Sequence, residues 1–137
     1  MRGPEAKLYQ KVKRANPKIL WHRIENIAIP GMPDVLGYTE KFWYFTVEFK
    51  VTRSNKLKFS PHQIAYHVAH PHNSFILAEH LGSGTVKLYE GSVVRELVAC
   101  GLLLDPRSYQ RGSNKRYLSG VPLSPGPGLK VIAPPLR

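Results

Sequence analysis

The sequence predicts one α/β domain over residues 1–105, followed by a basic tail, rich in proline and glycine, over residues 106–137. Apolar residues at helical spacing alternate along the chain with short runs of β-branched and aromatic residues. The chain has 137 residues, of which 42% are hydrophobic. This suffices for the core of one domain and excludes a wholly disordered chain. The expected order of elements is α-β-β-β-α-β-β-α.

A first helix is expected over residues 5–15. Leu8, Val12 and Ala15 recur there at helical spacing. Asn16-Pro17 ends this helix, because a residue before proline avoids the helical region.

Three strands are expected next, at residues 20–28, 33–38 and 42–51, with a turn at Pro30-Gly31 after the first of them. The strand at 42–51 is the clearest in the chain, since it is rich in aromatic and β-branched residues. Because a strand alternates its faces, this segment has one apolar face and one mixed face.

A second helix is expected to begin after Ser60 and to end before Pro71. Ser60 is a good N-cap, Pro61 suits the first helical position, and Gln63 completes a capping box. The apolar face of this helix is expected to comprise Ile64, Ala65, Val68 and Ala69.

Two strands and a helix complete the predicted domain. The strands are expected at residues 74–78 and 85–89, joined by a turn at Gly82-Ser83-Gly84. The helix is expected over residues 93–100, with Gly101 as its C-terminal cap.

The charge of the chain points to a polyanion as its partner. The chain has 20 Lys and Arg residues against 9 Asp and Glu, a net charge of +11, which favours nucleic acid. No segment has the length and apolar character of a membrane span or a signal peptide, so we expect no membrane partner and a cytoplasmic location. The single cysteine, Cys100, excludes an internal disulfide and is expected to be a buried thiol.

Two acids and a lysine are expected to meet on the sheet. Glu48 and Lys50 are two residues apart in a strand, so both project from one face, and Asp34 in the neighbouring strand can lie beside Glu48. Paired carboxylates suit Mg²⁺, which prefers oxygen ligands, and a lysine can orient or deprotonate a water for phosphodiester hydrolysis. We therefore expect Asp34 and Glu48 to bind Mg²⁺, with Mn²⁺ as an alternative ion, and Lys50 to act on the water. Ordinary surface charges are the alternative interpretation.

Three short motifs follow one another along the chain: Gly-Met-Pro-Asp at 31–34, Glu-Phe-Lys at 48–50 and Ser-Pro-His-Gln at 60–63. This stretch resembles the PD-(D/E)xK nuclease superfamily, and most closely the stand-alone VRR-NUC nucleases and Holliday-junction resolvases. The resemblance extends over roughly residues 5–100. It implies a restriction-endonuclease-like core, in which a central mixed β-sheet is flanked by helices.

The resemblance also implies roles for further residues. Glu5 on the first helix joins the site as a catalytic and metal-binding acid, with Glu25 on the following strand as the alternative. The backbone carbonyl of Phe49 is an additional metal ligand. Gln63 is a catalytic residue that lies near the active lysine or the substrate phosphate.

Basic residues around the proposed site are expected to contact the DNA backbone. Some lie in the loop before the second helix and others in the tail. The expected nucleic-acid contacts are Lys11, Arg53, Lys56, Lys58, Ser60, Arg111, Lys115 and Arg116. The histidines at 62, 67, 70 and 72 are expected to be polar helix-face or DNA-facing residues rather than zinc ligands.

The resulting hypothesis is a Mg²⁺-dependent endonuclease that cuts branched DNA, with the four-way junction as the first substrate to consider. Junction resolution needs two symmetric cuts, so we expect a homodimer. Two alternatives stand beside it. One is a non-catalytic basic nucleic-acid-binding protein, and the other is a restriction- or repair-type nuclease that acts on duplex or flap DNA. A small stand-alone nuclease of this kind suggests a phage or mobile element as the source.

Overall fold

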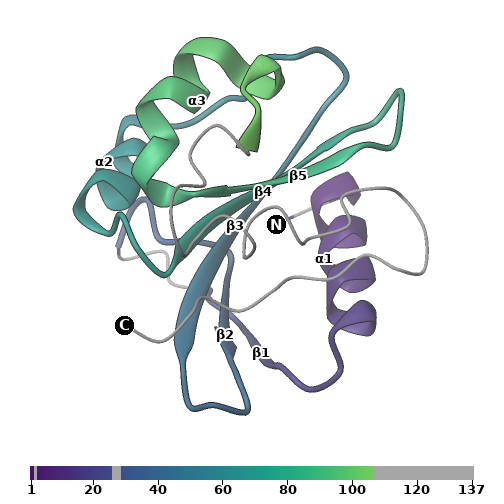
Figure 1. Ribbon diagram of the computed structural model, residues 1–137, viewed down its shortest axis with the longest axis vertical. Coiled ribbons are helices and arrows are strands. Elements are labelled where there is room, and N and C mark those ends of the chain that lie inside the picture. Colours follow the sequence, from purple (N-terminus) through teal and green to yellow (C-terminus); the bar gives the residue numbers. More distant parts are fainter. Residues whose placement is uncertain (2, 26–28, 107–137) are drawn as a thin grey trace.

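The computed structural model describes residues 1, 3–25 and 29–106, and it has an α/β fold with a mixed five-stranded sheet and flanking helices (Figure 1). The helices are α1 (Gly3–Ala15), α2 (Pro61–Ala69) and α3 (Val94–Cys100), with short 3-10 turns at η1 (Gly91–Val93) and η2 (Gly101–Leu103). The strands are β1 (Leu20–Arg23), β2 (Val35–Tyr38), β3 (Tyr44–Thr52), β4 (Ser74–His80) and β5 (Val86–Glu90). The predicted order of elements is therefore confirmed.

The sheet combines antiparallel and parallel pairing. Its strand order is β1-β2-β3-β4-β5, and the first three strands form an antiparallel meander. β3 pairs with β4 in parallel, with α2 in the connection between them, and β5 returns antiparallel to β4. β3 thus lies at the centre of the sheet, with β2 on one side and β4 on the other.

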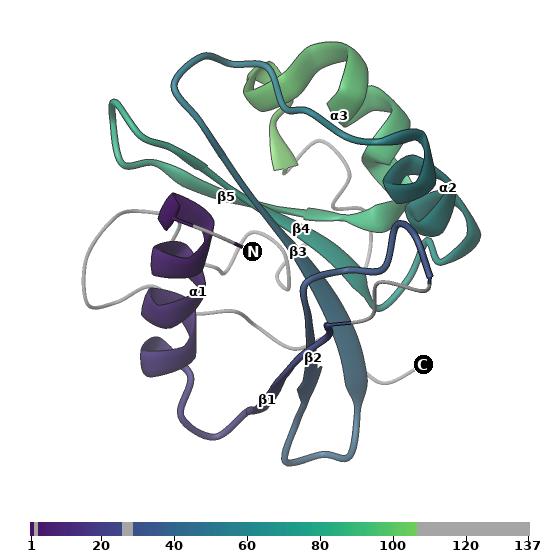
Figure 2. The same cartoon turned by 180° about the vertical axis from the view of Figure 1, so that it is seen from behind.

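Helices cover both faces of this sheet, as the two opposite views show (Figures 1 and 2). α1 packs on one face, where the main buried residues are Leu8, Tyr9, Val12, Val35, Phe45, Val47, Phe49, Phe75, Leu77, Val86 and Leu88. α2 and α3 lie on the other face, over a second cluster formed by Leu57, Ile76, Ala78, Tyr89, Val93, Val94, Leu97 and Leu102. Successive residues of β3 alternate between the faces. Because Phe45, Val47 and Phe49 point to α1, Glu48 and Lys50 point to the face that carries α2.

The buried side of α2 differs from the predicted one. Ile64 packs against the core as expected, but Val68 is 42% exposed and the two alanines face solvent. His67 is the buried residue of this helix. The helix is turned so that Gln63 and His67, one turn apart, face the sheet and form polar contacts there.

Cys100 is exposed, so the expectation of a buried thiol is wrong. α3 presents Val94 and Leu97 to the core, and Cys100 lies three residues after Leu97, at the end of a helix of seven residues. Gly101 follows with a φ of +59° as the predicted cap.

The predicted tail over residues 106–137 can be compared with the structure only at its first residue. Residues 107–137, and with them nearly all of the predicted tail, lie outside the described residues. Over the described ranges, no helix is long and apolar enough to cross a membrane.

Candidate active site

Asp34 lies immediately before β2, and its backbone is held from both sides. Its N–H donates to the Val47 carbonyl oxygen at 3.1 Å, and its own carbonyl accepts from the Ile24 N–H at 2.8 Å. Its Oδ2 accepts a hydrogen bond from the Phe49 N–H at 2.8 Å. These bonds fix the carboxylate against β3, beside Glu48.

The turn that carries Asp34 depends on Gly31. This glycine has a φ of +84° and lies against the backbone at the start of α2. A Cβ at this position would be 2.4 Å from the carbonyl oxygen of His62. The absence of a side chain therefore lets the turn approach the helix that carries Gln63.

We expect Gly31→Ala to lower the free energy of unfolding by about 1–3 kcal/mol, because the left-handed backbone and the contact with His62 both oppose a side chain. Urea unfolding measures the loss. Gly3→Ala is the matched control, since Gly3 also has a positive φ, +50°, but no atom lies within 4 Å of its added Cβ. Equal losses in the two variants would show that the approach to His62 is not what requires glycine.

Lys50 is surrounded by three groups on the α2 face. Its Nζ donates to Gln63 Oε1 at 3.0 Å, lies 3.8 Å from Glu48 Oε2, and lies 4.8 Å from the centroid of the Phe59 ring. Only 12% of the Lys50 side chain is exposed. The ammonium group thus lies beside Glu48 and Gln63 and is largely shielded from bulk solvent.

Gln63 links the start of α2 to this site. The predicted capping box is confirmed: the Gln63 N–H donates to Ser60 Oγ at 3.1 Å, and the Ser60 N–H donates to Gln63 Oε1 at 3.0 Å. The same amide contacts both site residues, because Oε1 also accepts from Lys50 and Nε2 donates to Glu48 Oε2 at 3.2 Å. Gln63, the partner of the N-cap Ser60 in the capping box, therefore also orients Lys50 and Glu48.

Burial and neighbouring charge raise the pKa of Glu48 to about 8. Burial is the largest cause, since only 4% of this side chain is exposed, and the negative charge of Asp34 comes next. Lys50 acts in the opposite direction, and a hydrogen bond with Asp34 and the charge of Glu5 raise the pKa further. With no added cation, Glu48 is therefore largely protonated at neutral pH.

One oxygen of Glu48 has the properties of a cation ligand. Glu48 Oε1 is buried and receives no hydrogen bond from a donor among the described residues, and the hydrogen bond of Glu48 with Asp34 requires a proton on one of the two carboxyl groups. In the described part of the chain, no three His, Cys, Asp or Glu side chains form a group that could hold a metal ion. Mg²⁺ commonly uses only one or two carboxylates and keeps several waters. The pair of Asp34 and Glu48 fits that mode of binding.

The Phe49 backbone faces the same corner of the sheet. Its N–H bonds to Asp34, and in an antiparallel strand the N–H and C=O of one residue face the same neighbouring strand. β2 begins only at Val35, so the Phe49 carbonyl faces the region of Asp34 beyond the end of that strand. Its role as a metal ligand stays a prediction.

Glu5, and not Glu25, is coupled to these residues. Partial burial and the Asp34 carboxylate raise the pKa of Glu5, and Lys50 acts against them. Glu25 instead forms an ion pair with Arg23, with 3.3 Å between Oε1 and Nη2, and 72% of its side chain is exposed. The acid on α1 is therefore the one that shares the electrostatic environment of the site.

The expected nucleic-acid contacts fall into three groups. Arg53, Lys56, Lys58 and Ser60 are exposed around the loop that leads from β3 to α2. Lys11 is on α1 and donates to Glu79 Oε2 at 2.9 Å, so part of its charge is compensated within the chain. The three tail residues, Arg111, Lys115 and Arg116, lie outside the described residues.

His67 is buried next to the site, so the prediction that it is a polar helix-face or DNA-facing residue is wrong. Burial, Lys50 and His70 together lower the pKa of His67 to about 4, so it is neutral at physiological pH. Its Nδ1 bonds to Ser74 Oγ, and its Nε2 has no partner among the described residues.

The contact between Phe59 and the Lys50 ammonium group was not predicted from the sequence. An aromatic residue one position before an N-cap carries no signal of a contact with a lysine on a distant strand.

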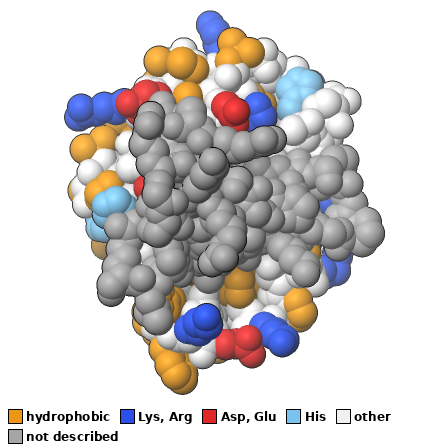
Figure 3. All heavy atoms as spheres, viewed as in Figure 1, with side chains coloured by type: hydrophobic (Ala, Val, Ile, Leu, Met, Phe, Trp, Pro, Cys, Tyr) orange, Lys and Arg blue, Asp and Glu red, His pale blue; other side chains and the backbone are white. Residues whose placement is uncertain are grey.

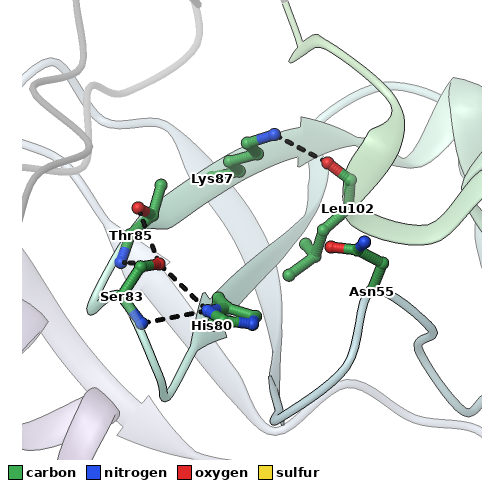
Figure 4. A pocket seen from close by; sticks show the side chains of 6 residues that line it. All are labelled: Asn55, His80, Ser83, Thr85, Lys87 and Leu102. Atoms are coloured by element: carbon green, nitrogen blue, oxygen red, sulfur yellow. Dashed lines mark hydrogen bonds between the residues drawn. The ribbon is translucent and has the colours of Figure 1, made fainter.

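A polar pocket of about 220 Å³ lies at the turn between β4 and β5, away from these residues (Figure 4). Its side chains bond to their own neighbours: Lys87 Nζ donates to the Leu102 carbonyl at 2.7 Å, and Ser83 Oγ lies 3.0 Å from His80 Nδ1. None of the predicted catalytic residues lines this pocket. We therefore place the candidate site at the start of β2 and not at this hollow.

In the view of Figure 3, the charged side chains of the described residues lie in several separate places and do not form a single patch. There, Lys and Arg side chains lie around the described part of the surface, and several have acidic side chains beside them.

Comparison of the sequence with models of known protein families and with curated proteins finds no match.

Proposed function

We propose that this protein is a metal-dependent endonuclease of the PD-(D/E)xK type that hydrolyses phosphodiester bonds in DNA. The main support is the buried carboxylate of Glu48. It lies beside Asp34, has one oxygen without a donor, and has Lys50 3.8 Å from the other oxygen. A buried acid beside a second, half-buried acid, with a lysine alongside, is costly to keep for stability alone, and it suits a site that receives a divalent cation.

The proposed roles follow from the positions of these groups. Asp34 and Glu48 hold Mg²⁺, the Phe49 carbonyl is a supporting ligand, and Glu5 adds negative charge close to the ion. The ion, when bound, would activate a water and offset charge on the phosphate. Lys50 orients the attacking water or takes its proton, and it stabilises negative charge on the phosphate in the transition state.

Branched DNA, and the four-way junction in particular, is the substrate we propose. The resemblance of the three motifs to Holliday-junction resolvases supports it, and so does the net charge of +11. A restriction-endonuclease-like core and a homodimer belong to the same proposal, because two symmetric cuts need two sites.

The test is a panel of end-labelled substrates, comprising a four-way junction, a flap, a linear duplex and a single strand, incubated with the full chain and either Mg²⁺ or EDTA. We expect Mg²⁺-dependent cleavage, with paired cuts on opposite strands of the junction. Binding without cleavage under all these conditions would indicate a non-catalytic nucleic-acid-binding protein. Cleavage confined to duplex or flap DNA would overturn the assignment to junctions. Light scattering that shows only monomer, with and without junction DNA, would overturn the dimer.

Gln63 offers a test of how the site is organised. We expect Gln63→Ala to reduce cleavage at least tenfold, because Lys50 and Glu48 lose their common partner, and to cost about 1 kcal/mol of stability through the cap. Gln63→Glu can keep the capping box but places a carboxylate where Nε2 donates to Glu48. We therefore expect near-normal stability and strongly reduced cleavage. Normal cleavage by Gln63→Glu would limit Gln63 to a capping role.

A further inference from the structure

A groove of about 650 Å³ is lined by one side of α1 and by residues at the end of β4. It is distinct from the carboxylate site, since neither Asp34 nor Glu48 lines it. The residues that line it are Pro4, Ala6, Lys7, Gln10, Lys11, Arg14, Glu79 and Leu81. Its volume is within the range of about 300–1000 Å³ that is typical of ligand-binding clefts.

The groove has cations along one helical row. Lys7, Lys11 and Arg14 are separated by four and three residues, so they share one face of α1. With a rise of about 1.5 Å per residue, they are spaced along the helix by roughly 6 Å and 4.5 Å. Lys7 and Arg14, at the two ends of this row, are thus roughly 10 Å apart along the helix, which suits a ligand with repeated negative charges better than one with a single charge.

The charges in the groove do not cancel. Among the described residues, Glu79 is the one acid that lines the groove, and it is already paired with Lys11. In the described part of the chain, Lys7 and Arg14 form no ion pair. The pair of Lys11 and Glu79 joins the middle of α1 to β4, and the two outer cations remain for a ligand. Pro4, Ala6 and Leu81 add apolar surface, against which a sugar can pack.

The groove begins next to the candidate active site. Pro4 and Ala6, two of its lining residues, flank Glu5 in the first turn of α1. Glu5 interacts electrostatically with Asp34 and Lys50. A strand that leaves the carboxylate site past the N-terminus of α1 would therefore enter the groove directly.

We propose that the groove along α1 binds the sugar–phosphate backbone of a nucleic-acid strand next to the site of cleavage, with Lys7 and Arg14 as the phosphate contacts. This inference rests on the proposed nuclease function, because it takes the bound strand to be part of the DNA that is cut. It is tested by binding alone, so absence of cleavage would not affect the test.

The experiment measures binding of the full chain to a fluorescent four-way junction and a fluorescent duplex, by anisotropy in EDTA, at several NaCl concentrations. Each phosphate contact contributes about 0.9 to the slope of log K against log salt on duplex DNA. We expect the double variant Lys7→Gln/Arg14→Gln to lose nearly 2 from the magnitude of that slope. Lys13→Gln/Lys18→Gln is the matched control, because it removes the same charge from exposed residues that do not line the groove. Its slope should change by much less.

Equal changes of slope in the two double variants would overturn the proposal, because net charge would then account for both. An unchanged DNA slope in the groove variant, together with loss of binding to a fluorescent polyglutamate peptide, would assign the groove to an acidic protein segment and would also overturn it. Thermal unfolding of both variants checks that their folds are equivalent.

Discussion

Lys50→Met is expected to lower the rate of Mg²⁺-dependent cleavage by about 10²- to 10⁴-fold, the range typical for loss of a positioned acid–base group. Methionine keeps much of the apolar stem but removes the ammonium group, which lies over the Phe59 ring and beside Glu48 and Gln63. Binding of DNA in EDTA should change little, because only 12% of the side chain is exposed to a ligand. The rate is measured in single-turnover cleavage at saturating protein.

Lys50→Arg separates the two roles proposed for this residue. Arginine keeps the positive charge near Glu48 but does not give up a proton in proteins. If Lys50 acts mainly by charge, we expect the arginine variant to retain more activity than the methionine variant. If it acts as a base, both should be equally impaired. Normal cleavage by Lys50→Met would show that Lys50 has no role in catalysis, which would contradict the proposed mechanism.

The relation between the acids and the lysine could be predicted because it depends on local rules. Alternation within β3 places Glu48 and Lys50 on one face, whatever the rest of the fold does. Asp34 follows from the antiparallel pairing of two strands that are adjacent in the sequence. The capping box of α2 is also local, and it positions Gln63.

Features that depend on packing between distant elements could not be predicted in this way. The rotation of α2 is set by polar contacts of Gln63 and His67 with the sheet, and apolar spacing alone favoured Val68 as a buried residue. A mixed sheet was predicted, but the register of β3 against β4, which places Ser74 within reach of His67, has no signal in either strand. The choice between Glu5 and Glu25 likewise required the relative positions of α1 and the sheet.

Glu48→Gln is expected to change how stability depends on pH. The pKa of Glu48 is about 8 in the folded protein, against 4.5 as the ordinary value. Between these pH values the folded state holds a proton that the unfolded chain has lost, so stability falls as pH rises from about 4.5 to about 8. Glu48 alone can change the free energy of unfolding by at most about 1.4 kcal/mol per pH unit. Above pH 8, Glu48 is ionised in both states, and its contribution becomes constant.

Glutamine resembles the protonated acid and has no such pH dependence. In EDTA, we therefore expect Glu48→Gln to be close to the wild type at pH 5 and clearly more stable at pH 9, as measured by urea unfolding. Glu25→Gln is the control, since the Glu25 side chain is 72% exposed and this variant should follow the wild-type profile.

Mg²⁺ should stabilise the wild type increasingly as pH rises towards 8, because the ion competes with the proton on Glu48. It should have little effect on Glu48→Gln. Parallel pH profiles for wild type and Glu48→Gln, and equal stabilisation of both by Mg²⁺, would show that Glu48 is not the group that exchanges a proton for a cation.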